Sequence, residues 1–326
     1  MTINFAVIGT NRITDHFLEA GSRVPGFCLK AVYSRSLERA EAYAKKHDAE
    51  LYFDSLEKLA VCPEVDAVYV ASPNSLHASQ SIRVMEAGKH VLCEKTIASN
   101  LQEFMRMRKT GEEHRVILLE AMRSEFSPGF AAIRDGIEKL GTIRRVSFQY
   151  CQYSRRYDNF RKGIIENAFR PELSNGALTD IGVYCVHPMA ALFGTPKRIQ
   201  SASVKLSNGV DGAGTIILEY PEMIGELIYS KITDSKVPSQ IQGEEGTMLI
   251  DRIADPQSVI IAYRNGMEER ADIPLTDNNM IYEIETFIKL AENGEYDNLY
   301  LDSSQIELQI MDEVRRQQNI VFPADL

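Results

Sequence analysis

The feature that most constrains the fold is an apolar run at residues 3–8 that ends at a glycine and leads into a helix-forming stretch. Residues 6–14 read Ala-Val-Ile-Gly-Thr-Asn-Arg-Ile-Thr. Gly9 permits a sharp turn because it lacks a Cβ, and a helix is expected over residues 12–19. The pattern therefore predicts a buried strand, a tight turn and a helix at the start of the chain.

This segment has the spacing of a dinucleotide-binding fingerprint, in which three glycines form the phosphate turn. Asn11 stands in place of the second glycine and Thr14 in place of the third. Asn tolerates left-handed backbone better than most residues, so we expect the turn to form. A buried strand followed by any tight turn is the alternative interpretation.

Strand and helix patterns then alternate along the chain, which predicts parallel strands joined by right-handed crossovers. Gly88 has the position of a residue just past a helix end, and Asn100 that of a helix cap. Together with the first strand, the pattern predicts a doubly wound (Rossmann) α/β domain over residues 1–122. The expected strands are 29–33, 50–53, 66–71, 90–94 and 116–121, and the expected helices are 37–47, 55–59, 75–87 and 101–114.

Residues 123–326 have a different pattern, in which successive strands follow one another without long helices between them. Turn signals such as Asn208-Gly209 and Asp211-Gly212 separate the strands. We therefore expect an α+β domain with a mostly antiparallel sheet and helices on one side. The exposed sheet face also predicts a homo-oligomer, a dimer or a tetramer. The expected strands are 143–152, 199–206, 213–220, 224–233, 247–250, 258–263 and 268–273. One helix is expected to begin at Ser127-Pro128, and two more are expected at 279–292 and 303–318.

Composition indicates a cytoplasmic protein that acts on small molecules. A net charge of -10 and a pI near 5.3 argue against nucleic acid or an anionic membrane as a partner. The five cysteines form no paired framework, so we expect reduced thiols. The scattered histidines predict no metal site, and no apolar run approaches the roughly 20 residues of a membrane span. We expect no signal peptide before the first strand.

The end of the second strand bears on the choice of dinucleotide. NAD enzymes commonly carry an acidic residue there for the ribose hydroxyls, whereas this chain has Ser34 and Arg35 and no acid before Glu38. A guanidinium and a hydroxyl suit the 2′-phosphate of NADP. We therefore predict NADP, with NAD possible. The alternative is that Arg35 is a solvated residue at the start of a helix.

Three further motifs lie in register with the fingerprint: residues 71–77 (Ala-Ser-Pro-Asn-Ser-Leu-His), 88–95 (Gly-Lys-His-Val-Leu-Cys-Glu-Lys) and 176–184 (Gly-Ala-Leu-Thr-Asp-Ile-Gly-Val-Tyr). In order and spacing the chain resembles the glucose–fructose oxidoreductase, inositol dehydrogenase and MocA (Gfo/Idh/MocA) family. Tyr184 replaces the histidine of many members, which resembles the dihydrodiol dehydrogenase branch. The resemblance implies an NAD(P)-dependent oxidoreductase that acts on a sugar, a polyol or a related carbonyl or alcohol.

The family's Glu-Lys-Pro motif corresponds to Glu94-Lys95-Thr96. Lys95 follows a parallel strand, at the edge where ligands of such sheets bind. A lysine at this position is not explained by core packing, because charged groups are rarely buried without a partner. The alternative is a purely structural ion pair between Lys95 and Glu94. Thr96 departs from the motif. Because a non-proline cis bond costs about 2.5–4 kcal/mol, we expect a trans bond before Thr96.

The second motif contains Asp180 and Tyr184, four residues apart, so that one helix would present both on one face. The resemblance implies that Tyr184 donates a proton to the substrate oxygen, with Lys95 lowering the tyrosine pKa from about 10. Asp180 would orient Lys95 or substrate hydroxyls. His187 extends the same face, and we interpret it as a helix-face residue rather than a catalytic one. The ring of Pro188 predicts a bend or break in the helix.

The fingerprint and the resemblance together assign cofactor contacts to residues at the strand ends. These are Gly9, Thr10, Asn11, Arg12, Ile13, Ser34, Arg35, Ser72, Pro73, Asn74, His77, Glu94, Lys95 and Arg123. A basic, aromatic segment at 150–170 predicts either a loop near the active site or a solvated or intersubunit loop.

The expected mechanism places the substrate carbonyl over the nicotinamide between the domains, where Lys95 and Tyr184 hydrogen-bond its oxygen. The alternative is a non-catalytic regulator that senses the nucleotide. The departures at Asn11, Thr14 and Thr96 favour that alternative. The presence of Lys95, Asp180 and Tyr184 favours the enzyme.

Overall fold

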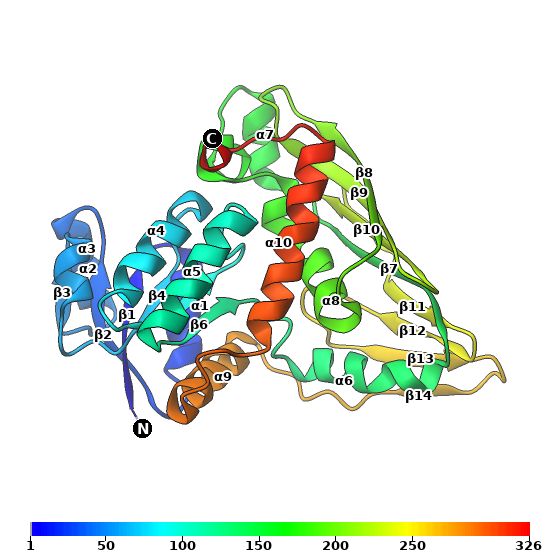
Figure 1. Cartoon of the computed structure of the whole chain (residues 1–326), viewed down its shortest axis with the longest axis horizontal. Helices are drawn as coiled ribbons and strands as arrows, with labels where there is room; N and C mark the ends of the chain where they lie inside the picture. The colour runs from blue at the N-terminus through cyan, green and yellow to red at the C-terminus, as the bar shows by residue number, and fades with distance from the viewer. Residues whose placement is uncertain (1) are drawn as a thin grey trace. The chain divides into compact units, whose positions relative to one another are not determined.

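The computed structural model describes residues 2–326, which form two compact units (Figure 1). The first unit comprises the chain up to Arg123 together with Asp277–Asp302. The second comprises Ser124–Thr276 and Ser303–Leu326. The sequence analysis did not anticipate that residues 277–302 return to the first unit.

The first unit is built on a six-stranded parallel sheet with strand order β3-β2-β1-β4-β5-β6. This is the doubly wound order in which the chain reverses direction between β1 and β4, and it confirms the predicted fold class. The strands are β1 (Ile3–Ile8), β2 (Phe27–Tyr33), β3 (Leu51–Phe53), β4 (Ala67–Val70), β5 (His90–Glu94) and β6 (Leu118–Ala121). The helices are α1 (Arg12–Gly21), α2 (Leu37–Lys46), α3 (Leu56–Ala60), α4 (Asn74–Met85), α5 (Leu101–His114) and α9 (Met280–Asn293).

Aromatic side chains pack α1 and α9 against this sheet. The ring of Phe17 on α1 stacks on Tyr69 of β4 with centroids 3.7 Å apart, and Phe287 of α9 lies 5.5 Å from Phe5 of β1. All four side chains are fully buried, and each such burial contributes about 1.5–3 kcal/mol. Helix α9 is therefore an integral part of the first unit.

The second unit contains an eight-stranded sheet of order β14-β13-β12-β11-β7-β10-β9-β8. Only β10 and β7 pair in parallel, which confirms a mostly antiparallel sheet. Its strands are β7 (Ile143–Cys151), β8 (Arg198–Lys205), β9 (Asp211–Glu219), β10 (Ile224–Ser230), β11 (Ser239–Gly243), β12 (Gly246–Ile250), β13 (Val259–Tyr263) and β14 (Glu268–Arg270). The helices are α6 (Pro128–Gly136), α7 (Arg155–Arg161), α8 (Val183–Phe193) and α10 (Tyr300–Gln317), with short turns η1 (Ile137–Leu140), η2 (Asn167–Phe169), η3 (Pro171–Leu173), η4 (Leu178–Gly182) and η5 (Pro323–Asp325). Helices α6 and α8 lie on one face of the sheet, as expected (Figure 1).

Three local expectations for the second unit were wrong. Strand β11 was not predicted, because its polar residues become a strand only by pairing with β7 and β12. The segment expected to be a loop contains helix α7, whose aromatic side chains pack on a small apolar cluster. Asp211-Gly212 is not a turn but the start of β9, because the carboxylate of Asp211 is buried against backbone N–H groups.

The apolar stretch Pro171–Phe193 is long enough, by length and composition, to cross a membrane. However, 72% of its most apolar window is buried inside the structure. It is therefore explained as a core segment of the second unit.

Candidate active site

The turn after β1 is built by Gly9 and Asn11. Gly9 has φ +109°, and a Cβ there would lie 2.6 Å from the carbonyl oxygen of Ala71, so that only glycine fits. Asn11 has φ -111° and caps α1: its side-chain oxygen accepts from Ile13 N at 3.0 Å and Thr14 N at 3.3 Å. Asn11 therefore does not use the left-handed backbone that asparagine tolerates, because the capping geometry needs extended backbone.

Asn11 also ties this turn to the end of β4, since its Nδ2 donates to Ala71 O at 2.8 Å. Asn11→Ala should destabilise the protein by about 1 kcal/mol, because the cap is lost. Asn11→Gly should cost only a few tenths of a kcal/mol, because glycine leaves the helix N–H groups open to water. Chemical denaturation of both variants tests this, and equal stabilities would contradict a capping role.

The other predicted cofactor residues of the first unit also lie at carboxyl ends of parallel strands. Ser34 and Arg35 follow β2, with Arg35 exposed. The Ser72 hydroxyl, just after β4, is buried and has no hydrogen-bond partner among residues 2–326. Thr10, Arg12 and Ile13 lie in the first turn and the start of α1, Pro73 and Asn74 begin α4, and Arg123 follows β6.

His77 is fully buried and joins two of these strand ends. Its Nδ1 lies 2.9 Å from the carbonyl oxygen of Thr96 and its Nε2 2.8 Å from that of Ser72. Burial lowers the pKa of His77, although both carbonyls oppose this effect. A neutral ring carries one N–H and so donates to only one of the two carbonyls at a time. Because its two nitrogens lie next to Ser72 O and Thr96 O, His77 links the turn after β4 to the Lys95–Thr96 segment.

Lys95 follows β5 directly and is half-buried. The Lys95–Thr96 peptide bond is cis, so the expected trans bond is wrong. The expectation used the cost of a non-proline cis bond in isolated peptides, which does not include the tertiary contacts of this segment. Ile97 N donates to Glu120 Oε1 at 2.9 Å, and Thr96 O contacts His77.

Glu94 and Glu283 both carry buried carboxyl groups in the first unit. Tyr69 donates its hydroxyl to Glu94 Oε1 at 2.5 Å, and burial raises the pKa of Glu94. Glu283 on α9 is fully buried, and burial, reinforced by the charge of Glu94, raises its pKa well above the ordinary value. Arg123 acts on both carboxyl groups in the opposite direction. The sequence did not indicate a role for Glu283, because a glutamate is common on exposed faces of helices and nothing in its local sequence marks it as buried.

In the second unit, Asp180 and Tyr184 belong to two different kinds of helix. Asp180 lies in the π-helical turn η4, and Tyr184 in the first turn of α8. One regular helix was expected to carry both. The chain stays helical through Pro188 to Phe193, so no break occurs there. Tyr184 is buried, and its ring packs edge-on against Tyr150 at 5.7 Å.

The start of η4 is fixed by Asp211, whose carboxylate accepts from Ala177 N at 3.1 Å and Leu178 N at 2.7 Å. A Cβ at Gly176 would lie 2.2 Å from the same carboxylate, which explains the glycine of this motif. Burial raises the pKa of Asp211, while these N–H groups oppose the effect. The π-turn is therefore positioned by β9, more than 30 residues away along the chain.

Asp180 forms an ion pair with Lys231, the residue that follows β10. The Lys231 side chain is only 3% exposed, whereas that of Asp180 is 30% exposed. Sequence analysis missed Lys231, because it lay inside the strand expected at 224–233, whereas β10 ends at Ser230.

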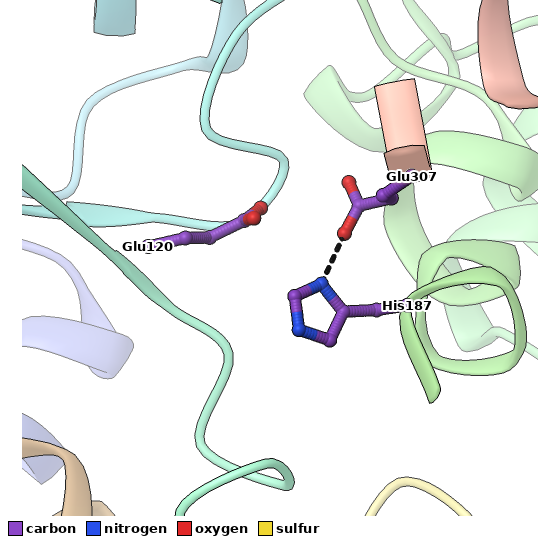
Figure 2. A group of neighbouring side chains, drawn as sticks. All are labelled: Glu120, His187 and Glu307. Atoms are coloured by element: carbon purple, nitrogen blue, oxygen red, sulfur yellow. Dashed lines mark hydrogen bonds and ion pairs between the residues drawn. The ribbon is translucent and has the colours of Figure 1, made fainter. Parts of the chain in front are cut away.

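His187 lies between two carboxylates of the second unit. Its Nδ1 is 2.6 Å from Glu307 Oε2 of α10, and its Nε2 is 2.8 Å from Glu125 Oε2. Figure 2 shows the ring directed at Glu307. Burial alone would lower the pKa of His187, but the two glutamates raise it well above its ordinary value. The imidazolium is therefore a buried link between α8, α10 and the chain before α6.

The basic segment at 150–170 is partly structured by its own contacts. Arg156 pairs with Glu166 at 3.5 Å, and Tyr153 donates to Asp158 at 2.8 Å. Tyr157 and Phe160 of α7 pack against Phe169. Its other basic residues, Arg155, Arg161, Lys162 and Arg170, are exposed.

Comparison with known sequences identifies the family. Residues 3–122 match the family described as "Oxidoreductase family, NAD-binding Rossmann fold", and residues 130–249 match the "GFO/IDH/MocA C-terminal domain". The chain is 48% identical to scyllo-inositol 2-dehydrogenase (NADP(+)) IolU of Bacillus subtilis (strain 168), over 99% of each chain. It is 29% identical to trans-1,2-dihydrobenzene-1,2-diol dehydrogenase of Xenopus laevis, over 99% of this chain and 100% of the relative.

Solved structures share the fold at low sequence identity. KijD10, a 3-ketoreductase from Actinomadura kijaniata in complex with NADP and TDP-benzene, has a TM-score of 0.85 and 22% identity over 97% of this chain and 98% of that one. Aldose-aldose oxidoreductase from Caulobacter crescentus has a TM-score of 0.83 and 20% identity over 98% of each chain. With both matched domains and a relative of 48% identity along the whole chain, this protein belongs to the GFO/IDH/MocA family of oxidoreductases.

Proposed function

We propose that this protein is an NADP-dependent oxidoreductase that interconverts a secondary alcohol of a cyclic polyol or sugar and the corresponding ketone. The observation that carries this proposal is the 48% identity, along the whole chain, to scyllo-inositol 2-dehydrogenase (NADP(+)). The chain also has Lys95, Asp180 and Tyr184 in the two motifs where the family carries its catalytic groups.

The residues of the first unit fit a dinucleotide. Gly9 keeps the turn after β1 free of a Cβ, and the N-terminus of α1 that follows favours a phosphate group. The buried Ser72 hydroxyl offers a donor and an acceptor to a ligand. We propose that the residues assigned above, from Gly9 to Arg123, line this site, with His77 acting by positioning its neighbours. When bound, the nicotinamide supplies or accepts a hydride at the substrate carbon.

In the direction of ketone reduction, we propose that Lys95 and Tyr184 act on the same substrate oxygen. The Lys95 ammonium stabilises the negative charge that develops on this oxygen. The Tyr184 hydroxyl gives it a proton. The ring of Tyr184 packs edge-on against that of Tyr150. Asp180 accepts hydrogen bonds from neighbouring substrate hydroxyls. In the direction of alcohol oxidation these roles reverse.

Arg35 is proposed to bind the 2′-phosphate of NADP. Arg35→Ala should weaken NADPH binding by about 10- to 100-fold, since hydrogen bonds between charged groups contribute about 1.5–3 kcal/mol. NADH binding should change little. Titrations that follow the fluorescence of the reduced nicotinamide measure both affinities, with Arg106→Ala, an exposed substitution on α5, as the control. An equal loss for both cofactors would argue against this role.

The proposed function is tested by a substrate screen. Purified protein is assayed for NADP⁺ reduction with scyllo-inositol, other inositols and aldoses, and for NADPH oxidation with the corresponding ketones. We expect turnover with at least one cyclic polyol and a kcat/KM that is higher with NADP⁺ than with NAD⁺. Tight NADPH binding without turnover of any of these compounds would favour a nucleotide-sensing regulator instead.

We further propose that residues 1–122, together with residues 277–302 of the first unit, form the dinucleotide-binding domain. The rest of residues 123–326 would form the substrate-binding and oligomerisation domain. The sheet face opposite α6 and α8 supports a homo-oligomer, a dimer or a tetramer. Light scattering of the purified protein measures its mass against the 36.7 kDa of one chain. A cytoplasmic location is consistent with five cysteines that form no disulfide within residues 2–326.

A further inference from the structure

We propose that Lys231 is a positioning residue for the substrate. It fixes the direction of the Asp180 carboxylate, so that this carboxylate accepts a hydrogen bond from a hydroxyl group of a neutral polyol. The inference rests on the proposed function and deepens it, because it names a residue outside both sequence motifs.

The Lys231 ammonium is held on several sides. It contacts Asp180 Oδ2, lies 3.5 Å from the carbonyl oxygen of Ala168, and sits 4.8 Å from the centre of the Phe169 ring. Its backbone is fixed as well: Lys231 N donates to Gly212 O at 2.8 Å, and Lys231 O accepts from Ser154 N at 2.9 Å. A long, flexible side chain is thereby held at one point in space.

An apolar cluster covers the buried side of this ion pair. Ala168, Phe169 and Val210 are buried there, and Tyr157 and Phe160 of α7 pack against them. Water is therefore excluded from one side of the ammonium, where attraction to a carboxylate is stronger than in water. Ala168 and Phe169 of the basic segment at 150–170 thus contact the Lys231 ammonium, and α7 packs against them.

Stability alone is a poor reason for such a pair. Moving an ammonium out of water costs several kcal/mol, and hydrophobic replacement of buried ion pairs is often neutral or stabilising. The pair instead sets the direction of a functional group. Lys231 is 3% exposed, whereas Asp180 is 30% exposed, so the ammonium is sealed and the carboxylate remains accessible.

The direction of the Asp180 carboxylate is important because Asp180 lies close to Tyr184 along the chain. Both residues belong to one continuous stretch, η4 followed by α8, whose start is fixed by Asp211. An accessible carboxylate is a hydrogen-bond acceptor only. It therefore selects a ligand with a hydroxyl near the reacting carbon and disfavours an anionic group there. A neutral polyol or sugar meets this requirement.

The test compares Lys231→Met, Asp180→Asn and the double variant with the wild type, using the polyol that the screen identifies. Lys231→Met should lower kcat/KM at least tenfold, mainly through a higher KM, while the Kd for NADPH stays within twofold. A variant that is merely misfolded in part would lower kcat and leave KM unchanged. Because Lys231 acts through Asp180, the double variant should be no worse than Asp180→Asn alone.

Two further variants complete the experiment. Lys231→Arg keeps the charge and should restore part of the lost kcat/KM. Lys205→Met removes an exposed lysine at the end of β8 and should leave the kinetics unchanged. If circular dichroism shows that Lys231→Met does not fold, Lys231→Gln replaces it, with the same rise in KM expected.

Wild-type kinetics in a folded Lys231→Met or Lys231→Gln variant would overturn the inference and leave the proposed function standing. Additive losses in the double variant would also overturn it, because Lys231 would then act independently of Asp180. Absence of turnover by the wild type itself, with every polyol, would instead overturn the proposed function and with it the substrate role of Asp180.

Discussion

Replacing Lys95 by alanine is expected to lower kcat by about 100- to 1,000-fold, the usual effect of removing one group that stabilises a developing negative charge. Lys95 follows β5 at the edge of the sheet where ligands of such folds bind. The variant should bind NADPH nearly as well as the wild type, because the fingerprint turn around Gly9 remains intact. Steady-state assays and fluorescence titration with NADPH measure the two quantities separately.

The control for Lys95 is Lys58→Ala, which removes an exposed lysine on α3 and should change neither quantity. Turnover of Lys95→Ala equal to that of the wild type would rule out Lys95 as a catalytic residue. Loss of NADPH binding in the same proportion as activity would assign Lys95 to cofactor binding instead.

His187→Asn is expected to give the largest loss of stability, about 3–5 kcal/mol, because it leaves two carboxylates without their buried cation. Glu307 is fully buried, and the Glu125 side chain is only 10% exposed. Chemical denaturation of the wild type and the variant near pH 6 measures this loss. His16→Asn, which replaces an exposed histidine on α1, should stay within about 0.5 kcal/mol of the wild type.

The contribution of His187 should also depend on pH. Its pKa in the folded protein lies well above the ordinary value of 6.5, so that folding favours the protonated ring. The stabilisation is therefore complete below about pH 6.5 and is lost as the pH rises through the folded pKa. The difference between wild type and His187→Asn should shrink from pH 6 to pH 9. A difference that grows over this range would show that the ring is neutral in the folded state.

Local sequence patterns were sufficient for the parallel sheet of the first unit, but not for the return of residues 277–302 to that unit. The parallel sheet could be predicted because each strand and helix has its own periodicity, and alternation implies crossovers. The carboxyl-end positions of Gly9, Arg35 and Lys95 follow from that topology. The hydrogen bond that ties Asn11 to the end of β4 did not follow, because its partner Ala71 lies 60 residues away along the chain.

Much of the candidate site in the second unit could not be predicted, because its key contacts join distant segments. Lys231 meets Asp180 across 51 positions, and His187 meets Glu307 across 120. The dipeptide Asp211-Gly212 has a sequence typical of turns, but Asp211 is the first residue of strand β9. Such residues are recognised only when the fold brings the charges together, since their local sequences are typical of surface loops and helices.

Hydride transfer itself provides the most direct test of the proposed activity. NADPH that carries deuterium at both C4 positions of the nicotinamide is incubated with the protein and the ketone that supports the fastest NADPH oxidation. The alcohol product is then analysed by NMR and mass spectrometry. The account predicts one deuterium on the carbinol carbon for each NADPH consumed. NADPH consumption without deuterium in the product, or no consumption with any polyol-derived ketone, would contradict it.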